Sequence, residues 1–476
     1  MRGSMSSCNA SPTNSSCPDH LFIRLANQIG QGNGARGMDS KQMLALAERV
    51  SEIIPVGLTG RVTRLSGLTI AATEFPVPVG ALCRVHRGSQ RLAEAEVVGF
   101  RDQETLLLPL GDIAGLRRGD SISLQNSAPQ VRVGEQMLGR VFNARGDILD
   151  GGDKPALPHR RSLFGAPPAS MSRPRITEPL GTGIRAIDAL LTCGKGQRVG
   201  LFAGSGVGKS TLLGQIARGS QADVNVVVLV GERGREVREF LEKSLGPDGL
   251  RRTVVIVATG DEAPTLRLRA AHFGTTVAEF FRDQGRDVLL LVDSLTRFAH
   301  AQREVGFAAG EPPAARGFPP SVFSVLPKLV ERTGYSESGS ITGLYTVLVD
   351  GDDFNEPIAD AVRGLLDGHW VLSRRLAEQA HWPALDVLAS ISRVMPDVTT
   401  PQHRTTADQL KRVLAAYRHH EDLISVGAYQ SGSHPLVDAA IRERPRWTDF
   451  LQQPLDQPTH LPDTLARLRH LATQLS

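Results

Sequence analysis

The sequence predicts an α/β protein in which a mostly parallel sheet forms the main domain, with a small β-barrel before it and a helical domain after it. Short apolar strands separated by turn residues follow residue 55, strands alternate with helical stretches from about residue 198 to 349, and helical periodicity dominates after Pro401. At 476 residues the chain is long enough for two or three domains. The predicted regions are a disordered extension, the barrel, the main domain and the helical domain, at residues 1–48, 49–127, 128–398 and 399–476.

Composition favours a soluble protein that does not bind nucleic acid. Lys and Arg total 54 and Asp and Glu total 50, and the net charge of +4 is too small and too dispersed to indicate a nucleic-acid surface. Cys8, Cys17, Cys83 and Cys193 form no Cys-x-x-Cys pair, so free thiols in a reducing compartment are expected. Because no apolar run has the length of a membrane helix and no secretory signal is evident, a cytoplasmic location is predicted.

The first 38 residues are rich in Ser, Asn, Gly and Pro, which predicts disorder. Two interpretations of this segment stay open. Met38 is an alternative start, and Met1-Arg2-Gly3-Ser4 resembles an expression-vector leader.

Between Pro55 and Gln125, runs of Val, Leu and Thr alternate with Gly, Pro and Asp turns. Five or six short strands at this spacing are typical of a small β-barrel. Some barrels stack nucleic-acid bases on aromatic side chains, but this segment has almost none, so a structural collar is predicted. The strands are expected at residues 60–65, 68–72, 81–85, 93–100 and 105–110.

The segment between barrel and main sheet is predicted to be a surface linker, because residues 155–179 hold many Pro and Arg residues. A helix is expected over residues 182–191. A short apolar strand over residues 198–202 and an amphipathic helix over 212–218 then flank a glycine-rich segment.

That segment, Ala203-Gly204-Ser205-Gly206-Val207-Gly208-Lys209-Ser210-Thr211, is the strongest chemical signal in the chain. A glycine-rich turn between a strand and a helix start points backbone N–H groups at a phosphate. Lys209 would reach the β- and γ-phosphates, and Ser210 would place its hydroxyl on Mg²⁺. The usual pattern has Gly where this chain has Ala203, but the strand–loop–helix context outweighs that difference.

Further strands are expected at residues 224–230, 254–258, 288–292 and 341–349, and their alternation with helices predicts a parallel sheet covered on both faces. One of them runs directly into Asp293. A carboxylate at the tip of a strand beside the phosphate loop can hold Mg²⁺, usually through water. The alternative is an Asp that caps the next turn.

A second carboxylate, Glu232, follows the strand that ends at residue 230. Hydrolysis of a phosphoanhydride needs a group that positions the attacking water, and a carboxylate at a neighbouring strand tip suits that role. The alternative is an exposed turn carboxylate. Glu236 and Glu239 are expected on the following helix, in exposed pairs with Arg233 and Arg235.

A third cluster lies between Trp382 and Arg393. The Trp382 ring, which precedes a proline, could stack on a purine, although core packing explains it almost as well. Arg393 could stabilise charge in a phosphoryl-transfer transition state, or it is an ordinary surface residue. After Pro401, helices over residues 407–419, 435–442 and 461–475 predict a separate helical cap.

Together these residues resemble the catalytic-subunit family of rotary ATPases, and within it the ATPases of flagellar and type III protein export. The resemblance runs from about Ile53 to about Gln453. Two departures are Ala203 in place of the first glycine and Trp382 in place of the usual Tyr, which bears on nucleotide selectivity. The matching stretches are 203–211, 231–237, 293–299, 301–304, 310–313, 317–323, 383–392, 421–424 and 427–429.

The resemblance implies a P-loop NTPase core of the RecA-like type that hydrolyses ATP with Mg²⁺. By this likeness Lys209 and Ser210 bind the phosphates, Ser210 and Asp293 hold Mg²⁺, and Glu232 activates the water. The implied nucleotide-binding residues are Ala203, Gly204, Ser205, Gly206, Val207, Gly208, Lys209, Ser210, Thr211 and Trp382.

Three arginines complete the implied site. Arg233 and Arg297 would line the phosphate pocket, and Arg393 resembles an arginine finger that enters the site of a neighbouring subunit. A finger supplied in trans requires a ring, which the family builds as a homohexamer, so an isolated monomer should bind ATP yet hydrolyse it poorly.

The resemblance also implies partners. Residues 306–320 would face a central pore, where family members contact a coiled-coil stalk subunit. Peripheral stator proteins, export substrates and chaperones would be further partners. The implied location is the cytoplasm, with peripheral association at the inner face of the membrane that holds the secretion machine.

Three other functions are compatible with parts of the sequence. A catalytic subunit of an ion-translocating ATP synthase fits less well, because one chain carries Lys209, Glu232, Asp293 and Arg393 together, as a homohexamer requires. A hexameric RNA translocase is disfavoured by the aromatic-poor barrel. A non-catalytic nucleotide sensor would not need Glu232. The choice between a flagellar and an injectisome role stays open.

Overall fold

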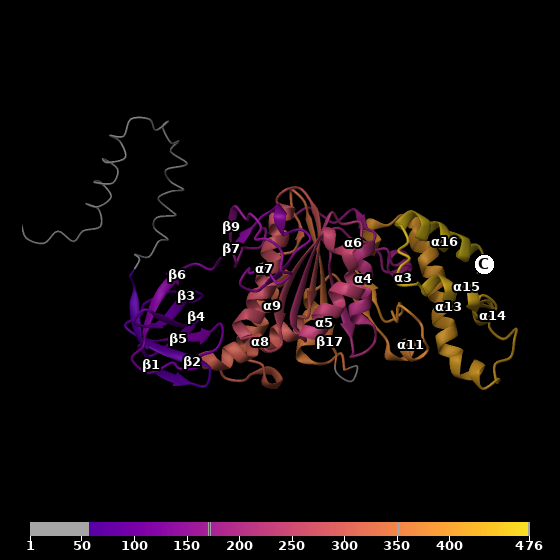
Figure 1. Cartoon of the computed structure of the whole chain (residues 1–476). Helices are drawn as coiled ribbons and strands as arrows, with labels where there is room; N and C mark the ends of the chain where they lie inside the picture. Colours follow the sequence, from indigo (N-terminus) through magenta and orange to yellow (C-terminus); the bar gives the residue numbers. More distant parts are fainter. Residues whose placement is uncertain (1–56, 170, 172, 350–352, 475–476) are drawn as a thin grey trace, which may run out of the picture. The chain divides into compact units, whose positions relative to one another are not determined.

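The structure is a computed structural model that describes residues 57–169, 171, 173–349 and 353–474 (Figure 1). The predicted disordered extension, Met38, Cys8 and Cys17 lie outside the described residues. The boundaries of the four predicted regions remain predictions.

The first described elements form a closed barrel with strand order β1-β2-β5-β4-β3-β6. Its core comes from period-two patterns: in β4, Ala93, Ala95 and Val97 point inward and are buried, while the residues between them are partly exposed. The predicted barrel is therefore confirmed, and Cys83 in β3 is a buried free thiol. Its strands are β1 (Thr59–Ser66), β2 (Thr69–Thr73), β3 (Leu82–Arg87), β4 (Gln90–Arg101), β5 (Glu104–Pro109) and β6 (Ser121–Asn126).

The predicted parallel sheet is also confirmed. Its strand order is β19-β18-β12-β17-β15-β13-β14-β8, and the strands from β18 to β8 run parallel. β19 at one edge and β16 beside β17 are antiparallel. The strands are β8 (Val141–Asn143), β12 (Arg198–Ala203), β13 (Val224–Glu232), β14 (Thr253–Thr259), β15 (Asp287–Asp293), β16 (Gly334–Tyr335), β17 (Ser340–Leu348), β18 (Gly368–Val371) and β19 (Ile391–Ser392).

Helices cover both faces of this sheet, so its central strands are buried on both sides. In β13, Val227 and Leu229 pack on one face with residues of α3, α4 and the C-terminal helices, whereas Val226 and Val228 pack on the other with α7 to α10. Figure 1 shows α7 and α9 on one side of the strands and α4 and α6 on the other. Near-continuous runs of Val, Leu and Ile are what such doubly covered strands require.

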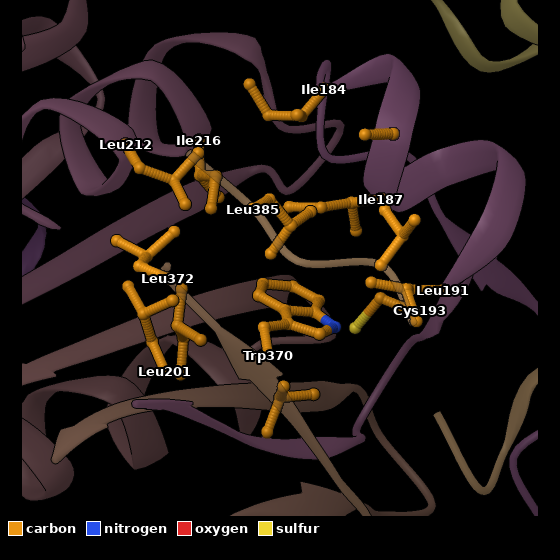
Figure 2. Close-up of a cluster of buried hydrophobic side chains, with 14 of the residues drawn as sticks. Ile184, Ile187, Leu191, Cys193, Leu201, Leu212, Ile216, Trp370, Leu372 and Leu385 are labelled. Carbon is orange, nitrogen blue, oxygen red and sulfur yellow. The ribbon is translucent and has the colours of Figure 1, made fainter. Parts of the chain in front are cut away.

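Figure 2 shows the centre of the first of these two cores, where the Trp370 ring of β18 lies among aliphatic side chains. Ile187 and Leu191 reach it from the region of α3, and Leu212 and Ile216 belong to α4. The helix that follows the glycine-rich loop is thus anchored to the sheet through this cluster. Cys193, a buried free thiol, lies in the same core.

The helices of the main domain are those that the alternating pattern requires, with several short additions. They are α3 (Arg185–Leu190), α4 (Lys209–Gly219), α5 (Gly234–Glu239), the π-helix η3 (Phe240–Leu245), α6 (Gly246–Arg251), α7 (Pro264–Arg282), α8 (Leu295–Ala309), the 3-10 turn η4 (Ala315–Gly317), α9 (Pro320–Val330), α10 (Pro357–Leu365), α11 (Arg374–Glu378) and α12 (Met395–Val398).

Three expectations need correction. The helix predicted over 182–191 is shorter, because the Asp188 carboxylate accepts the Thr182 and Gly183 N–H groups and closes a turn before α3. The predicted linker 155–179 contains a strand, β9 (His159–Ser162), which pairs with β7 (Gln130–Val133). The predicted pore loop is partly helical, because α8 continues to Ala309 and ends at Gly310, whose φ is +91°. The remaining short elements are η1 (Glu135–Met137), β10 (Pro179–Leu180) and β11 (Cys193–Gly194).

The C-terminal region is helical, as predicted. It contains α13 (Pro401–Ser425), α14 (Pro435–Arg442), α15 (Arg444–Leu451) and α16 (Leu461–Gln474). α15 was missed, because its Arg-Pro-Arg start shows little periodicity. No helix among the described residues is long and apolar enough to span a membrane.

Two buried polar side chains tie this region to the main domain. Arg185 at the start of α3 donates to the carbonyls of Asp449 and Phe450, each at 3.0 Å, and also to that of Gln452. The Gln453 side chain accepts the Arg185 N–H at 2.9 Å and donates to Gly183 O at 2.7 Å. A guanidinium at the end of α15 satisfies carbonyls that the helix itself leaves unpaired.

Candidate active site

The glycine-rich loop joins β12 to α4 as predicted. Ala203 is the last residue of β12 and pairs in register with Leu348 of β17, a strand position that accommodates a methyl group. Gly208 has φ +86° and directly precedes Lys209, the first residue of α4. The loop therefore presents backbone N–H groups at a helix start, the arrangement that binds phosphate.

Two carboxylates at neighbouring strand ends converge on the lysine of this loop. Glu232 ends β13 and Asp293 ends β15, two adjacent parallel strands. Lys209 Nζ lies 2.6 Å from Asp293 Oδ1 and 3.5 Å from Glu232 Oε1. The three side chains that the sequence selected separately thus form one cluster.

Arg297 in α8 approaches the same oxygen of Glu232 as Lys209 does. Its Nε lies 3.3 Å from Glu232 Oε1. Gly231, with φ +71°, permits this approach, because a methyl group there would lie 2.8 Å from Arg297 Cδ. Glu232 is consequently flanked by two cations.

The electrostatics of the cluster favour the protonated form of Glu232. Burial raises the pKa of Glu232 to about 7, and Asp293 and a hydrogen bond to Glu236 act in the same direction against Lys209 and Arg297. That hydrogen bond lowers the pKa of Glu236. Burial disfavours the Lys209 ammonium, but Asp293 and Glu232 outweigh it and raise its pKa. Glu232 is thus the group that can exchange a proton near neutral pH.

A cleft of about 660 Å³ opens over this cluster. Val207 lies below the loop surface and is buried. The cleft lining includes most of the predicted residues: Ala203, Gly204, Ser205, Gly206, Gly208, Lys209, Ser210, Thr211, Glu232 and Arg297. Lining residues that the sequence did not indicate are Arg218, Glu236, Glu239, Phe240, Lys243, Ser244, Leu348 and Leu455.

Trp382 lies against the loop. A methyl group on Gly208 would come within 2.9 Å of the Trp382 ring, and 40% of the tryptophan is exposed. Its carbonyl accepts the Gln453 N–H at 2.8 Å. The ring is therefore beside the loop and partly exposed, although Trp382 is not among the residues that line the cleft, and its base-stacking role stays a prediction.

Two predicted arginines are not brought to the cleft of their own chain. The Arg233 side chain is 84% exposed and its nearest carboxylate is Glu236, at 3.9 Å. Arg393 is exposed, and its N–H donates to the carbonyl of Asp367, the residue before β18, whose own N–H donates to Arg198 at the start of β12. Glu239 pairs with Lys243 at 2.6 Å, which corrects the expected pairing with Arg235.

Thr346 is a site residue that sequence reasoning missed. Its buried hydroxyl donates to Asp293 Oδ1 at 2.6 Å. A threonine inside an apolar strand is too common to stand out, although a hydroxyl in a doubly covered strand requires a partner. Leu455 was missed because it belongs to the distant segment after α15.

The site offers oxygen donors for a metal ion but no complete metal cage. Ser210 is exposed in the first turn of α4 and lines the cleft, whereas the Asp293 carboxylate is buried and lies 2.6 Å from Lys209 Nζ. The described residues contain no group of three His, Cys, Asp or Glu side chains that could hold a metal. This donor set fits Mg²⁺, which keeps water ligands and shares phosphate oxygens.

Sequence comparisons agree with this geometry. Residues 183–392 match the ATP synthase alpha/beta family, nucleotide-binding domain, and residues 399–470 match the T3SS EscN ATPase C-terminal domain. The "Flagellum-specific ATP synthase" of Bacillus subtilis (strain 168) is 50% identical over 414 residues, covering 87% of this chain and 94% of the relative. This chain belongs to the family of flagellar and type III secretion ATPases.

Both branches of the flagellar and type III secretion ATPases resemble the chain. The "SPI-2 type 3 secretion system ATPase" of Salmonella typhimurium is 50% identical over 398 residues, covering 84% of this chain and 91% of the relative. The structure of the assembled ATPase EscN from enteropathogenic E. coli matches with a TM-score of 0.81 and 44% identity, covering 87% of this chain and 100% of EscN. A second EscN structure, with its central stalk EscO, matches equally well.

Proposed function

We propose that this chain hydrolyses ATP in a homohexameric ring and thereby drives protein export through a flagellar or type III secretion apparatus. The observation that carries the proposal is the cluster in which Lys209, Glu232 and Arg297 line the cleft and the buried Asp293 contacts Lys209. A protein that only binds nucleotide needs the loop and its lysine, but not a carboxylate such as Glu232 with a pKa near 7.

In this mechanism the loop N–H groups and Lys209 hold the phosphates of ATP. Glu232 orients a water toward the γ-phosphorus and accepts its proton as the oxygen attacks and ADP leaves. Arg297 keeps the Glu232 carboxylate in place and adds positive charge beside the phosphates.

Ser210 and Asp293 are the residues proposed to hold Mg²⁺ with the nucleotide. When bound, the ion neutralises the charge on the β- and γ-phosphates. The Lys209 ammonium would then leave the Asp293 carboxylate and contact phosphate oxygens instead.

Arg393 is proposed to act on the site of a neighbouring copy. Its backbone is joined through Asp367 to Arg198, the first residue of β12, whereas the phosphate loop begins after the last residue, Ala203. The length of a six-residue strand, about 17 Å, exceeds the reach of an arginine side chain. A role for Arg393 in hydrolysis therefore requires a second subunit. Arg233 directly follows Glu232, and its exposed side chain is proposed to line the phosphate pocket once nucleotide is bound.

The proposed partners follow from the relatives. Because EscN assembles with a central stalk, EscO, we propose a central coiled-coil stalk here, facing residues 310–319 after α8. Peripheral stator proteins, export substrates and chaperones, and a location at the inner face of the membrane complete the proposal. It covers both the flagellar and the injectisome branch.

The test is ATP hydrolysis measured against protein concentration, with oligomer mass recorded in parallel. Specific activity should rise as the ring forms. Glu232→Gln and Arg393→Ala should each lose at least about 100-fold in activity while still binding nucleotide.

Matched controls are Glu242→Gln and Arg412→Ala, which change exposed residues outside the cleft and should leave activity unchanged. Activity that does not depend on concentration, together with full activity of Arg393→Ala, would refute the ring mechanism.

A further inference from the structure

The buried hydroxyl of Thr346 lies where three strands of the site meet. Thr346 belongs to β17, which runs between β12 with its phosphate loop and β15 with Asp293. Its Oγ1 is 2.6 Å from Asp293 Oδ1 and 3.4 Å from the Val292 carbonyl. A hydroxyl has one proton, and the shorter, charge-assisted contact takes it. Thr346 therefore donates to Asp293.

Asp293 Oδ1 receives a second donor on the same atom. Lys209 Nζ lies 2.6 Å from it. The oxygen therefore accepts from Thr346 in the sheet and from Lys209 at the loop. Within the described part of the chain, no hydrogen bond reaches Oδ2. The carboxylate is thus held by one oxygen, and no donor of the described residues occupies the other.

Binding of a nucleotide would change this balance. The Lys209 ammonium is the group that moves to phosphate oxygens, whereas Thr346 has no exposed surface and sits inside the sheet. Once Lys209 has turned to the phosphates, the Thr346 hydroxyl is the remaining donor to Oδ1 within the described residues.

We infer that Thr346 is a positioning residue, whose hydroxyl holds Asp293 so that Oδ2 faces the Mg²⁺ shell of the bound nucleotide. This inference rests on the proposed function. Partners that orient a metal-binding side chain typically change metal affinity or activity by 10–100-fold when they are removed. A purely structural threonine would instead affect folding alone.

The test compares three variants with the wild type. Thr346→Val removes the hydroxyl and keeps the shape, and Thr346→Ser keeps the hydroxyl. Thr296→Val is the matched control, because the Thr296 hydroxyl is also buried near the site but accepts the Leu348 N–H at 2.9 Å instead of contacting Asp293.

Two readouts are needed. The first is the Mg²⁺ concentration that gives half-maximal ATP hydrolysis at saturating ATP. The second does not involve turnover: free Mn²⁺ is measured by electron paramagnetic resonance during titration of the protein with ADP present. For Thr346→Val we expect both constants to weaken about tenfold. Thr346→Ser and Thr296→Val should stay close to the wild type.

Unchanged Mg²⁺ and Mn²⁺ constants in Thr346→Val, with an active wild type, would overturn the inference. Failure of the proposed function differs, since the wild type itself would then not hydrolyse ATP. If Thr346→Val does not fold, Thr346→Ala removes the same hydroxyl and is compared with Thr346→Ser under the same criteria.

Discussion

At the tip of β13, Glu232 is 8% exposed, and Lys209 and Arg297 lie on either side of it. Two cations would normally keep a carboxyl group ionised far below neutral pH. Here burial opposes them, as do Asp293 and the hydrogen bond to Glu236, so the pKa of Glu232 is about 7. The side chain can therefore both accept a proton from water and release it afterwards.

A pH profile tests this property. Because the carboxylate is the active form and the pKa of Glu232 in the free protein is about 7, kcat/KM should rise about tenfold between pH 6 and pH 8. Glu236→Gln should move the midpoint to lower pH, because an amide can donate to the Glu232 carboxylate. A flat profile over this range would show that Glu232 is ionised throughout.

The sequence could identify the site residues that lie at recognisable positions, such as the end of an apolar strand or the start of a helix. Lys209 follows a glycine-rich turn, and Glu232 and Asp293 end apolar strands, so their convergence follows from parallel strand packing. Thr346 could not be found in this way, because its partner depends on the strand order β12-β17-β15. The place of Arg233 outside the cleft depends on how the backbone turns after Glu232, which the sequence does not express.

At the scale of elements, the central strands of the sheet were predicted best. The runs of Val, Leu and Ile in β13, β14 and β15 are continuous because helices cover both faces. Helix ends depended on turns closed by distant or local side chains, such as Asp188 before α3. The sequence did not predict β9, because its four residues are all exposed and three of them are basic.

The join between α3 and α15 provides a test at this scale. Arg185→Ala removes donors to three carbonyls at the end of α15 and should lower the free energy of unfolding by about 3 kcal/mol. Urea unfolding measures this change, and amide exchange should show that α15 opens first. Arg251→Ala, which removes an ion pair whose partners are both more than 80% exposed, should cost less than about 0.5 kcal/mol. Equal losses in the two variants would contradict the role of Arg185.

At the scale of the whole molecule, the proposed catalytic residues lie at opposite ends of one sheet. Glu232, Lys209 and Asp293 cluster beyond the carboxyl ends of the strands, while Arg393 sits beside the first residue of β12. The two proposed halves of the site therefore cannot meet within a single chain. The resemblance implied this separation, but residue spacing alone does not give it, because it depends on the antiparallel pairing of β19 with β18.

Mixing two inactive variants tests the division. In a ring with head-to-tail contacts, Glu232→Gln subunits supply an intact Arg393 and Arg393→Ala subunits supply an intact Glu232. Random mixing in equal amounts should restore about one quarter of the complete sites, and activity should recover in proportion. Refolding or reassembly of the mixture, followed by a hydrolysis assay, measures this. Two Glu232→Gln preparations mixed together serve as the control, and no recovery in the mixed sample would place both groups in one chain.

The course of β12 has a further consequence for a ring of identical copies. One end of the strand leads into the loop that would surround the chain's own phosphates, and the other end carries, through Asp367, the backbone of the arginine offered to the next copy. Strand β12 would thus be linked to two nucleotides that are bound to different subunits. Nucleotide binding at one site would then affect the site of one neighbouring subunit and not that of the other, because head-to-tail contacts have a polarity. In such a ring, ATP hydrolysis at successive sites would proceed around the ring in one preferred direction.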